Sequence, residues 1–127
     1  MAAPPSDEDV SGFISDTFGS VWALEVLLLL KREGARASPR TELVSALRAS
    51  DSVIDQSISG LLAAGLVVIE DDGSARYAPA GAALGALVEA AEALYRQKPD
   101  AVRRLIILPR HDGLSAFSDA FRLRKDR

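Results

Sequence analysis

The chain has 127 residues, a length typical of one compact domain, and its 48% of hydrophobic residues can supply a core, which excludes disorder throughout. It has no cysteine, which excludes disulfides, thiolate metal sites and a cysteine nucleophile. Residues 1–90 hold six Lys and Arg against thirteen Asp and Glu (net −7), and residues 91–127 hold nine against five (net +4). An acidic body lacks the overall basic character of a strong nonspecific nucleic-acid binder.

Residues 1–12 combine acidic side chains with prolines and lack a basic region followed by an apolar run. They predict a disordered acidic leader rather than a secretory signal. The most apolar run, Val21 to Leu30, has about half of the ~20 residues that span a bilayer and is interrupted by Glu25. We therefore expect a cytoplasmic protein with no membrane partner.

The first two predicted helices follow from apolar spacing and end signals. Apolar residues recur densely from Phe13 to about Arg32, and Gly34 ends this first, largely buried helix. A second, shorter helix starts at Ser38-Pro39, where a capping residue precedes a first-turn proline, and ends near Arg48.

A third helix is predicted from about Ser52 to Ala64, before the stop at Gly65. Its two faces differ in chemistry. The predicted core stripe consists of Ile54, Ile58, Leu61 and Leu62. The opposite face carries Ser52, Asp55, Gln56 and Ser59.

A hairpin and further helices follow. The run Leu66 to Ile69, the turn signal Asp71-Asp72-Gly73-Ser74 and the run Ala75 to Ala78 predict two antiparallel strands. A long alanine-rich helix runs from Gly81 to about Lys98 and is broken by Pro99. Another helix is expected from Asp100 to Leu108, and Leu114, Phe117 and Phe121 predict a short amphipathic tail helix with a basic end.

Three helices, a hairpin and a long helix follow the order of a winged helix-turn-helix. The segments Leu61 to Val67, Asp71 to Tyr77 and Gly81 resemble the helix end and wing of MarR-like bacterial winged-helix regulators, over roughly residues 20–98. The resemblance implies a mainly α fold with a small β-hairpin wing and C-terminal helices. We expect a leader over 1–12, a winged-helix domain over 13–98 and a C-terminal helical extension over 99–127.

In that family the third helix enters the major groove of duplex DNA and the wing follows the backbone. The resemblance thus implies DNA contacts from Arg40, Arg48, Ser52, Asp55, Gln56, Ser59 and Arg76. The chain departs from the family because residues 52–64 contain no Lys or Arg and the wing tip reads Glu70-Asp71-Asp72. The phosphate contacts would then depend on the flanking arginines.

Each of these residues also has an ordinary structural interpretation. Asp51 is expected as a cap or first-turn partner of the helix dipole rather than a base reader. Asp55, Gln56 and Ser59 could form a solvated face, and Arg76 could pair with Glu70 across the hairpin. The basic tail could cover the core of its own chain, join two copies or bind another protein.

The resemblance and the apolar helices predict a homodimer. Candidate residues of a dimer or partner interface are Trp22, Leu87, Leu94, Phe117 and Phe121. Catalytic residues, metal ligands and cofactors are not expected, because the one histidine, His111, lies outside any catalytic motif.

Two functions remain after these exclusions. The leading hypothesis is a dimeric winged-helix transcriptional regulator that reads duplex DNA through the third helix and wing. The alternative is a winged-helix protein-interaction module whose acidic face binds a basic partner, such as a component of the transcription machinery. This alternative rests on the net charge of −7 over residues 1–90 and on a third helix without basic residues.

Overall fold

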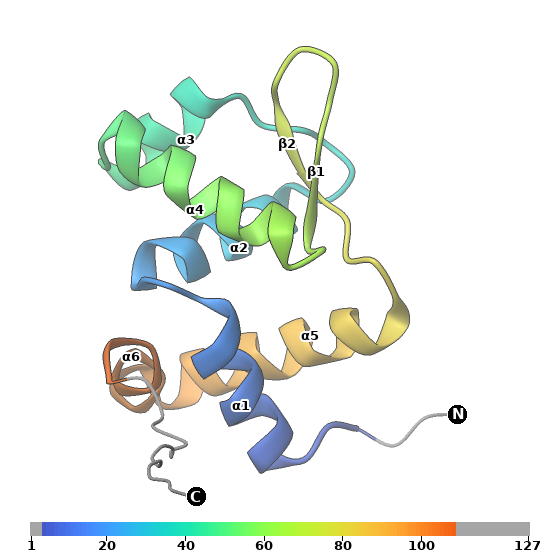
Figure 1. The fold of residues 1–127 in the computed structure, drawn as a ribbon, viewed down its shortest axis with the longest axis vertical. Coiled ribbons are helices and arrows are strands. Elements are labelled where there is room, and N and C mark those ends of the chain that lie inside the picture. Colours follow the sequence, from blue (N-terminus) through green and yellow to red (C-terminus); the bar gives the residue numbers. More distant parts are fainter. Residues whose placement is uncertain (1–3, 109–127) are drawn as a thin grey trace, which may run out of the picture.

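The computed structural model describes residues 4–108 and is mainly helical with one two-stranded antiparallel sheet, as the sequence predicts (Figure 1). Its elements in chain order are α1 (Asp7–Thr17), α2 (Val21–Glu33), α3 (Arg40–Leu47), α4 (Asp51–Ala63), β1 (Val67–Ile69), β2 (Ala75–Tyr77), α5 (Ala82–Gln97) and α6 (Pro99–Ile107). The predicted tail helix with Phe117 and Phe121, and also His111, lie outside the described residues.

Helix α2 is the centre of the fold. Its buried side chains come from most of its circumference: Ala23, Leu24, Val26, Leu27, Leu28 and Leu30. A helix that is apolar nearly all round is stable only when neighbours cover it on several sides. Helix α2 accordingly contacts α3, α4, β2 and α6.

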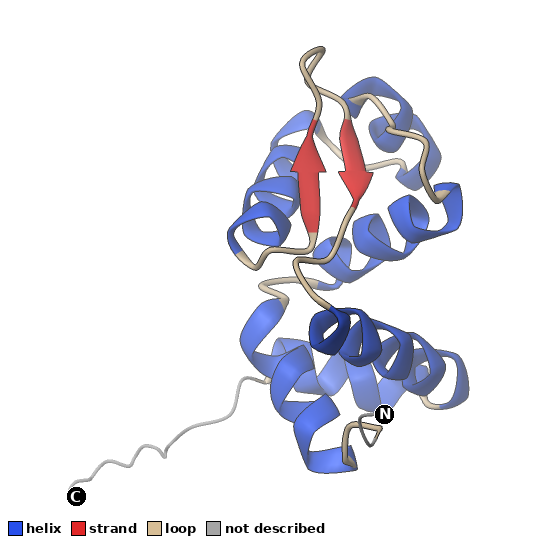
Figure 2. Cartoon of the chain, turned by 90° about the vertical axis from the view of Figure 1, so that its right-hand side faces the viewer, coloured by secondary structure: helices blue, strands red, loops and turns tan. Residues whose placement is uncertain are grey.

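The remaining elements form two groups, one at each end of the molecule. Helices α3 and α4 lie with the hairpin at one end, and α1, α5 and α6 pack on one another at the other end, with α2 between them (Figures 1 and 2). The buried core is continuous through both groups, from Leu43 and Ile54 to Val88 and Val102. The two ends therefore share one hydrophobic core.

The predicted disorder of residues 1–12 is wrong for the segment from Asp7 onward, where α1 begins. Ser6 caps this helix: its Oγ accepts a hydrogen bond from Asp9 N at 3.1 Å, and Asp9 returns one by accepting from Ser6 N at 3.3 Å. This is a capping box, a pattern that the acidic composition obscured. Val10 and Ile14 then bury the helix against the core.

The single helix predicted from Phe13 to Arg32 is two helices. The chain leaves α1 at Phe18, which is extended and buried, and Ser20 caps α2 by accepting from Ala23 N at 3.3 Å. The apolar run continues across this break, so hydrophobic spacing alone did not reveal it. The packing of Phe18 on Phe13, with ring centroids 5.7 Å apart, helps to hold the corner.

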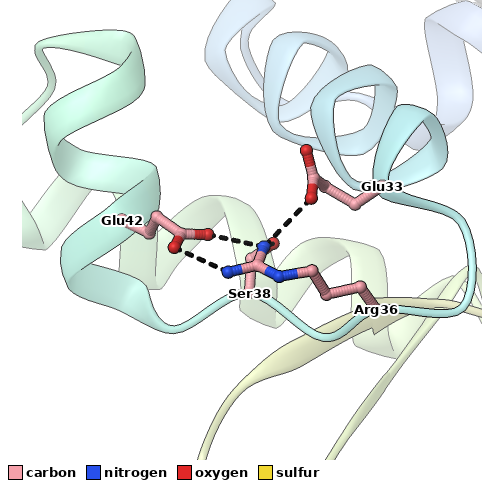
Figure 3. Close-up of polar contacts among 4 residues, drawn as sticks. All are labelled: Glu33, Arg36, Ser38 and Glu42. Carbon is pink, nitrogen blue, oxygen red and sulfur yellow. Dashed lines mark hydrogen bonds and ion pairs between the residues drawn. The ribbon is translucent and has the colours of Figure 1, made fainter.

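The loop from α2 to α3 is tied at both ends by Arg36. Its guanidinium donates to Glu33 at 3.0 Å and to both carboxylate oxygens of Glu42 at 2.8 Å (Figure 3). The hydrogen bonds with Arg36 keep the pKa of Glu42 below its ordinary value. Further along the loop, buried Ser38 exchanges two backbone hydrogen bonds with Ala75 of β2, at 2.8 and 2.9 Å. The loop thereby extends the small sheet by one bridge.

Two glycines shape the entry and the tip of the hairpin. Gly65 follows α4 with a φ of +77°, and a Cβ there would lie 3.4 Å from Ala80, so the stop predicted at this glycine is confirmed. Gly73, with a φ of +89°, turns the chain between the strands. The two strands are antiparallel, with Val68 opposite Arg76.

Helix α5 is fixed to α2 by polar contacts beside the core. Lys31 Nζ lies 2.9 Å from Glu92 and 3.1 Å from Glu89, and these partners, Glu92 first, raise the pKa of Lys31. Tyr95 donates its hydroxyl hydrogen to Glu25 of α2. Glu25, which interrupts the apolar run of α2, therefore has a hydrogen-bond partner 70 residues away in the sequence.

Within residues 4–108, none of the helices is by itself both long and apolar enough to cross a membrane. The consecutive helices α1 and α2 meet that criterion only when taken together, and they are bent by 109° relative to each other.

The burial of α1 predicts a measurable contribution to stability. Replacing Ile14, which is fully buried, with alanine should lower the free energy of unfolding by about 2–5 kcal/mol, because it leaves a cavity in the core. Chemical denaturation followed by circular dichroism measures this change. The control Glu8→Ala, at an exposed position of the same helix, should change it by less than about 1 kcal/mol. If Ile14→Ala is as mild as the control, α1 is not part of the core.

Candidate functional site

Helix α4 presents the predicted polar face to solvent. Ser52, Asp55, Gln56 and Ser59 are all exposed, while Ile54 and Leu61 are buried. Ser50 caps the helix by accepting from Val53 N at 3.1 Å, and Asp51 lies in the first turn. Asp51 therefore occupies the first turn, where a carboxylate interacts favourably with the helix dipole, and the cap is Ser50 rather than Asp51.

Leu62 was predicted to be in the core stripe of this helix, and that prediction is wrong. Its side chain is 48% exposed, and Ser57 takes a buried position instead. At about 100° per residue, Leu62 lies about 80° around the helix from Ile54, whereas Ser57 and Leu61 lie within about 60° of it. Leu62 thus projects beside the polar face rather than behind it.

Arg40 is paired with the helix that it was expected to assist. Its Nη1 donates to Asp55 Oδ2 at 2.9 Å, which links the start of α3 to the exposed face of α4. The side chains are 49% and 54% exposed, so the pair contributes at most about 1 kcal/mol to stability. Its main effect is on the surface charge, because it neutralises one of the arginines proposed to grip phosphate.

Arg76 is also paired. Its Nε donates to Glu70 Oε2 at 2.8 Å, so the pairing across the hairpin that the sequence suggested is confirmed. At the tip, Asp72 Oδ1 accepts from Ser74 N at 2.9 Å, and this hydrogen bond lowers the pKa of Asp72. The tip therefore displays Asp71 and Asp72 without a cation paired to either within residues 4–108.

Arg48 differs from the other two arginines. It is exposed and makes no ion pair with any residue that the structure describes. It ends α3 in the left-handed conformation, with a φ of +55°, which is unusual for a residue with a side chain. Of the three arginines predicted to contact DNA, Arg48 is the one whose charge is not offset by a neighbouring carboxylate in the described chain.

A groove of about 560 Å³ runs between the start of α3, the exposed face of α4 and the hairpin, and we refer to it as the α4–hairpin groove. It brings together residues that are far apart in sequence: Pro39, Arg40, Thr41, Asp55, Ile58, Ser59, Leu62, Ile69, Asp72 and Gly73. Of the predicted contact residues, Arg40, Asp55 and Ser59 line the groove, whereas Arg48, Ser52, Gln56 and Arg76 do not.

Sequence reasoning missed the apolar part of this groove. Leu62 is 48% exposed and Ile69 is 41% exposed, and both line it. The period-two pattern of a strand places Ile69 on the same face as buried Val67, so the sequence gives no signal that Ile69 is exposed. Only the tertiary structure places it in the same groove as Leu62.

The charge around the groove is negative. Between residues 39 and 77 the chain has three arginines and six acidic residues, a net charge of −3. Arg40 and Arg76 are each paired with one carboxylate, and Glu42 is paired with Arg36, so three acidic residues remain against Arg48. The groove therefore combines exposed aliphatic side chains with an acidic border.

The predicted interface residues lie mostly away from this groove. Trp22 at the start of α2 is 39% exposed. Leu87 and Leu94 are half-buried on α5, where each lines a different cleft beside α1. Phe117 and Phe121 lie outside the described residues. Trp22, Leu87 and Leu94 remain candidates for an interface, and the tail remains a sequence prediction.

Over residues 4–108, acidic and histidine side chains do not gather into a group of three that could hold a metal ion. The α4–hairpin groove is lined by aliphatic, acidic and hydroxyl side chains together with Arg40. Comparisons with models of protein families, with curated proteins and with solved structures found no match for this chain.

The hydrogen bond at the hairpin tip predicts a pH dependence. Because the pKa of Asp72 is lowered in the folded protein, its ionised carboxylate stabilises the hairpin above about pH 4, and this contribution is lost as the pH falls through the folded-state pKa. A carboxyl-carbon NMR titration should place the midpoint of Asp72 below the ordinary value for aspartate. Asp72→Asn keeps the acceptor oxygen and removes the titration, so it identifies the resonance. A midpoint at or above the ordinary value contradicts the hydrogen bond.

Proposed function

We propose that this chain is a winged-helix protein-interaction module whose α4–hairpin groove binds a basic segment of a partner protein that carries apolar side chains. The observation that carries the proposal is the composition of the groove, which exposed Leu62 and Ile69 line together with Asp55 and Asp72. Aliphatic contacts supply buried area in such a complex, and carboxylates select a basic partner.

The winged-helix assignment is supported by the order of the elements. Three helices, α2, α3 and α4, precede a two-stranded hairpin, and α5 follows it. The hairpin projects beside the exposed face of α4, as a wing does beside a third helix (Figures 1 and 2). The fold by itself does not select DNA over protein, because winged helices serve both.

The electrostatics favour a protein partner over duplex DNA. DNA affinity depends on Lys and Arg that neutralise phosphates. Here α4 has no basic residue, and Arg40 and Arg76 already pair with Asp55 and Glu70. A phosphate would have to displace each carboxylate and would then lie near it, which costs affinity. A basic polypeptide would instead be attracted by Asp71 and Asp72 at the hairpin tip, to which no cation is paired within residues 4–108.

Charge reversal in the groove tests the proposal. The partner is first captured in cells by a photo-crosslinking amino acid at Leu62, with Ile107 as a matched exposed apolar position at the other end of the molecule. Asp55→Lys should then weaken binding of the purified partner about tenfold or more, equivalent to ~1.4 kcal/mol, because it replaces an attraction with a repulsion. Isothermal titration calorimetry measures the change.

The control is Asp100→Lys, which makes the same charge change and also removes the acceptor of an exposed arginine, Arg103. It should leave the affinity within about twofold, since α6 is remote from the groove. The proposal fails if the segment crosslinked at Leu62 is acidic, or if Asp55→Lys and Asp100→Lys have the same effect. Crosslinking of Leu62 to DNA instead of protein also overturns it.

Duplex DNA is the second candidate, favoured by the winged-helix order of elements and by the unpaired Arg48. This hypothesis retains a dimer, which would double the arginines on one surface. It predicts the opposite response to Asp55→Lys, because removing a carboxylate and adding a cation strengthens binding to phosphate. The sign of the Asp55→Lys effect therefore separates the two functions.

Arg48→Gly is the sharpest test of DNA binding. The substitution removes the unpaired cation, and glycine adopts the left-handed conformation at this helix end more readily, so the fold should be retained or stabilised by up to about 1 kcal/mol. If DNA is the ligand, Arg48→Gly weakens binding to genomic fragments selected at low salt, as do Arg40→Ala and Arg76→Ala. Failure of the unchanged protein to retain any genomic fragment at low salt ends the DNA hypothesis.

A further inference from the structure

A second open cleft lies at the opposite end of the molecule, between α1 and the first half of α5, and we call it the α1–α5 cleft. It measures about 760 Å³ and is lined by Pro5, Glu8, Asp9, Gly12, Phe13, Asp16, Thr17, Ala82, Ala83, Ala86 and Leu87. Small residues on both helices keep it open, and half-buried Phe13 and Leu87 give it an apolar floor. An open cleft with an apolar floor suits the apolar side chains of another segment.

The border of this cleft is acidic. Glu8, Asp9 and Asp16 line it, and no lysine or arginine does so among residues 4–108. Asp9 also accepts the capping hydrogen bond from Ser6 N, which fixes one carboxylate at the mouth. The cleft therefore selects an occupant that is both apolar and basic.

The chain itself contains such a segment beyond the described residues. Leu114, Phe117 and Phe121 recur at helical spacing, and residues 122–127 carry four basic side chains against one acid. Aromatic residues next to a basic end match the apolar floor and the acidic border of the cleft. A covalently attached segment also has a high effective concentration at a nearby site.

The chain can reach the cleft. Leu108 lines a neighbouring cleft that also contains Pro5 and Asp7, so α6 ends beside α1. Helix α1 is about 10–12 Å across, and nine extended residues from Leu108 to Phe117 span up to roughly 30 Å. The neighbouring cleft is less suitable, since Lys98 and Arg104 line it. The α4–hairpin groove lies at the far end of the molecule from α6 (Figure 1).

We propose that residues 114–127 bind in the α1–α5 cleft of their own chain, with Phe117 and Phe121 on the apolar floor and the basic end at Glu8, Asp9 and Asp16. This contact covers a cleft of about 760 Å³ whose lining is both acidic and apolar. It is independent of the function proposed for the α4–hairpin groove.

Carbodiimide crosslinking of the full-length protein tests the proposal, because this reagent joins an amine directly to a carboxylate. The expected product joins Lys125 to Glu8, Asp9 or Asp16. The Lys31–Glu92 pair, 2.9 Å apart, is an internal positive control. Mixing ¹⁴N- and ¹⁵N-labelled protein before the reaction distinguishes a link within one chain from a link between two copies by mass spectrometry.

Variants test the chemistry of the contact. The double variant Phe117→Ser/Phe121→Ser should lose the Lys125 crosslink and should speed amide hydrogen exchange in α1, while the Lys31–Glu92 crosslink persists. Glu8→Lys should weaken the Lys125 crosslink, and Asp71→Lys, the same charge change at the remote hairpin tip, should not. Three results overturn the proposal. The Lys125 crosslink joins two copies of the chain, it does not form although the Lys31–Glu92 crosslink does, or it persists in the Phe117→Ser/Phe121→Ser variant.

Discussion

The burial of α2 is the constraint on which the rest of the structure depends. A helix whose side chains are apolar nearly all round has no stable place at a surface, so neighbours must cover several of its faces. Helices α3 and α4 and strand β2 cover one part, and α6 lies against another. Lys31 and Glu25 of α2 contact Glu92 and Tyr95 of α5. These contacts fix the position of α5 on α2. The two ends of the molecule are thus held in one arrangement.

The two ends present related surfaces made from different elements. At one end, exposed Leu62 and Ile69 line a groove together with Asp55 and Asp72. At the other, Phe13 and Leu87 lie under a border of carboxylates from α1. Each surface combines apolar side chains with negative charge. Both lie in the part of the chain, residues 1–90, that carries a net charge of −7. Such surfaces suit basic amphipathic polypeptides better than a nucleic-acid backbone.

The ion pairs explain why residue type alone gave an incomplete account of the candidate site. A sequence shows that Arg40 and Arg76 flank an acidic helix, but it does not show whether their charges are available. The pairing of Arg76 with Glu70 could be anticipated from the hairpin, since the two residues are close in sequence. The pairing of Arg40 with Asp55 could not, because it depends on how α3 crosses α4.

Local signals accounted for most element positions. Gly65 and Gly73 adopt positive φ, Ser50 caps α4 and Pro99 starts a new helix, so the sequence by itself determined approximately where α3, α4, the hairpin, α5 and α6 lie. Only the tertiary structure separated α1 from α2, since Phe18 breaks the helix while preserving the apolar pattern. The same holds for the exposure of Leu62 and for the groove that it shares with Ile69. Periodicity gives the direction of a side chain on its own helix, whereas its exposure depends on which distant elements pack beside it.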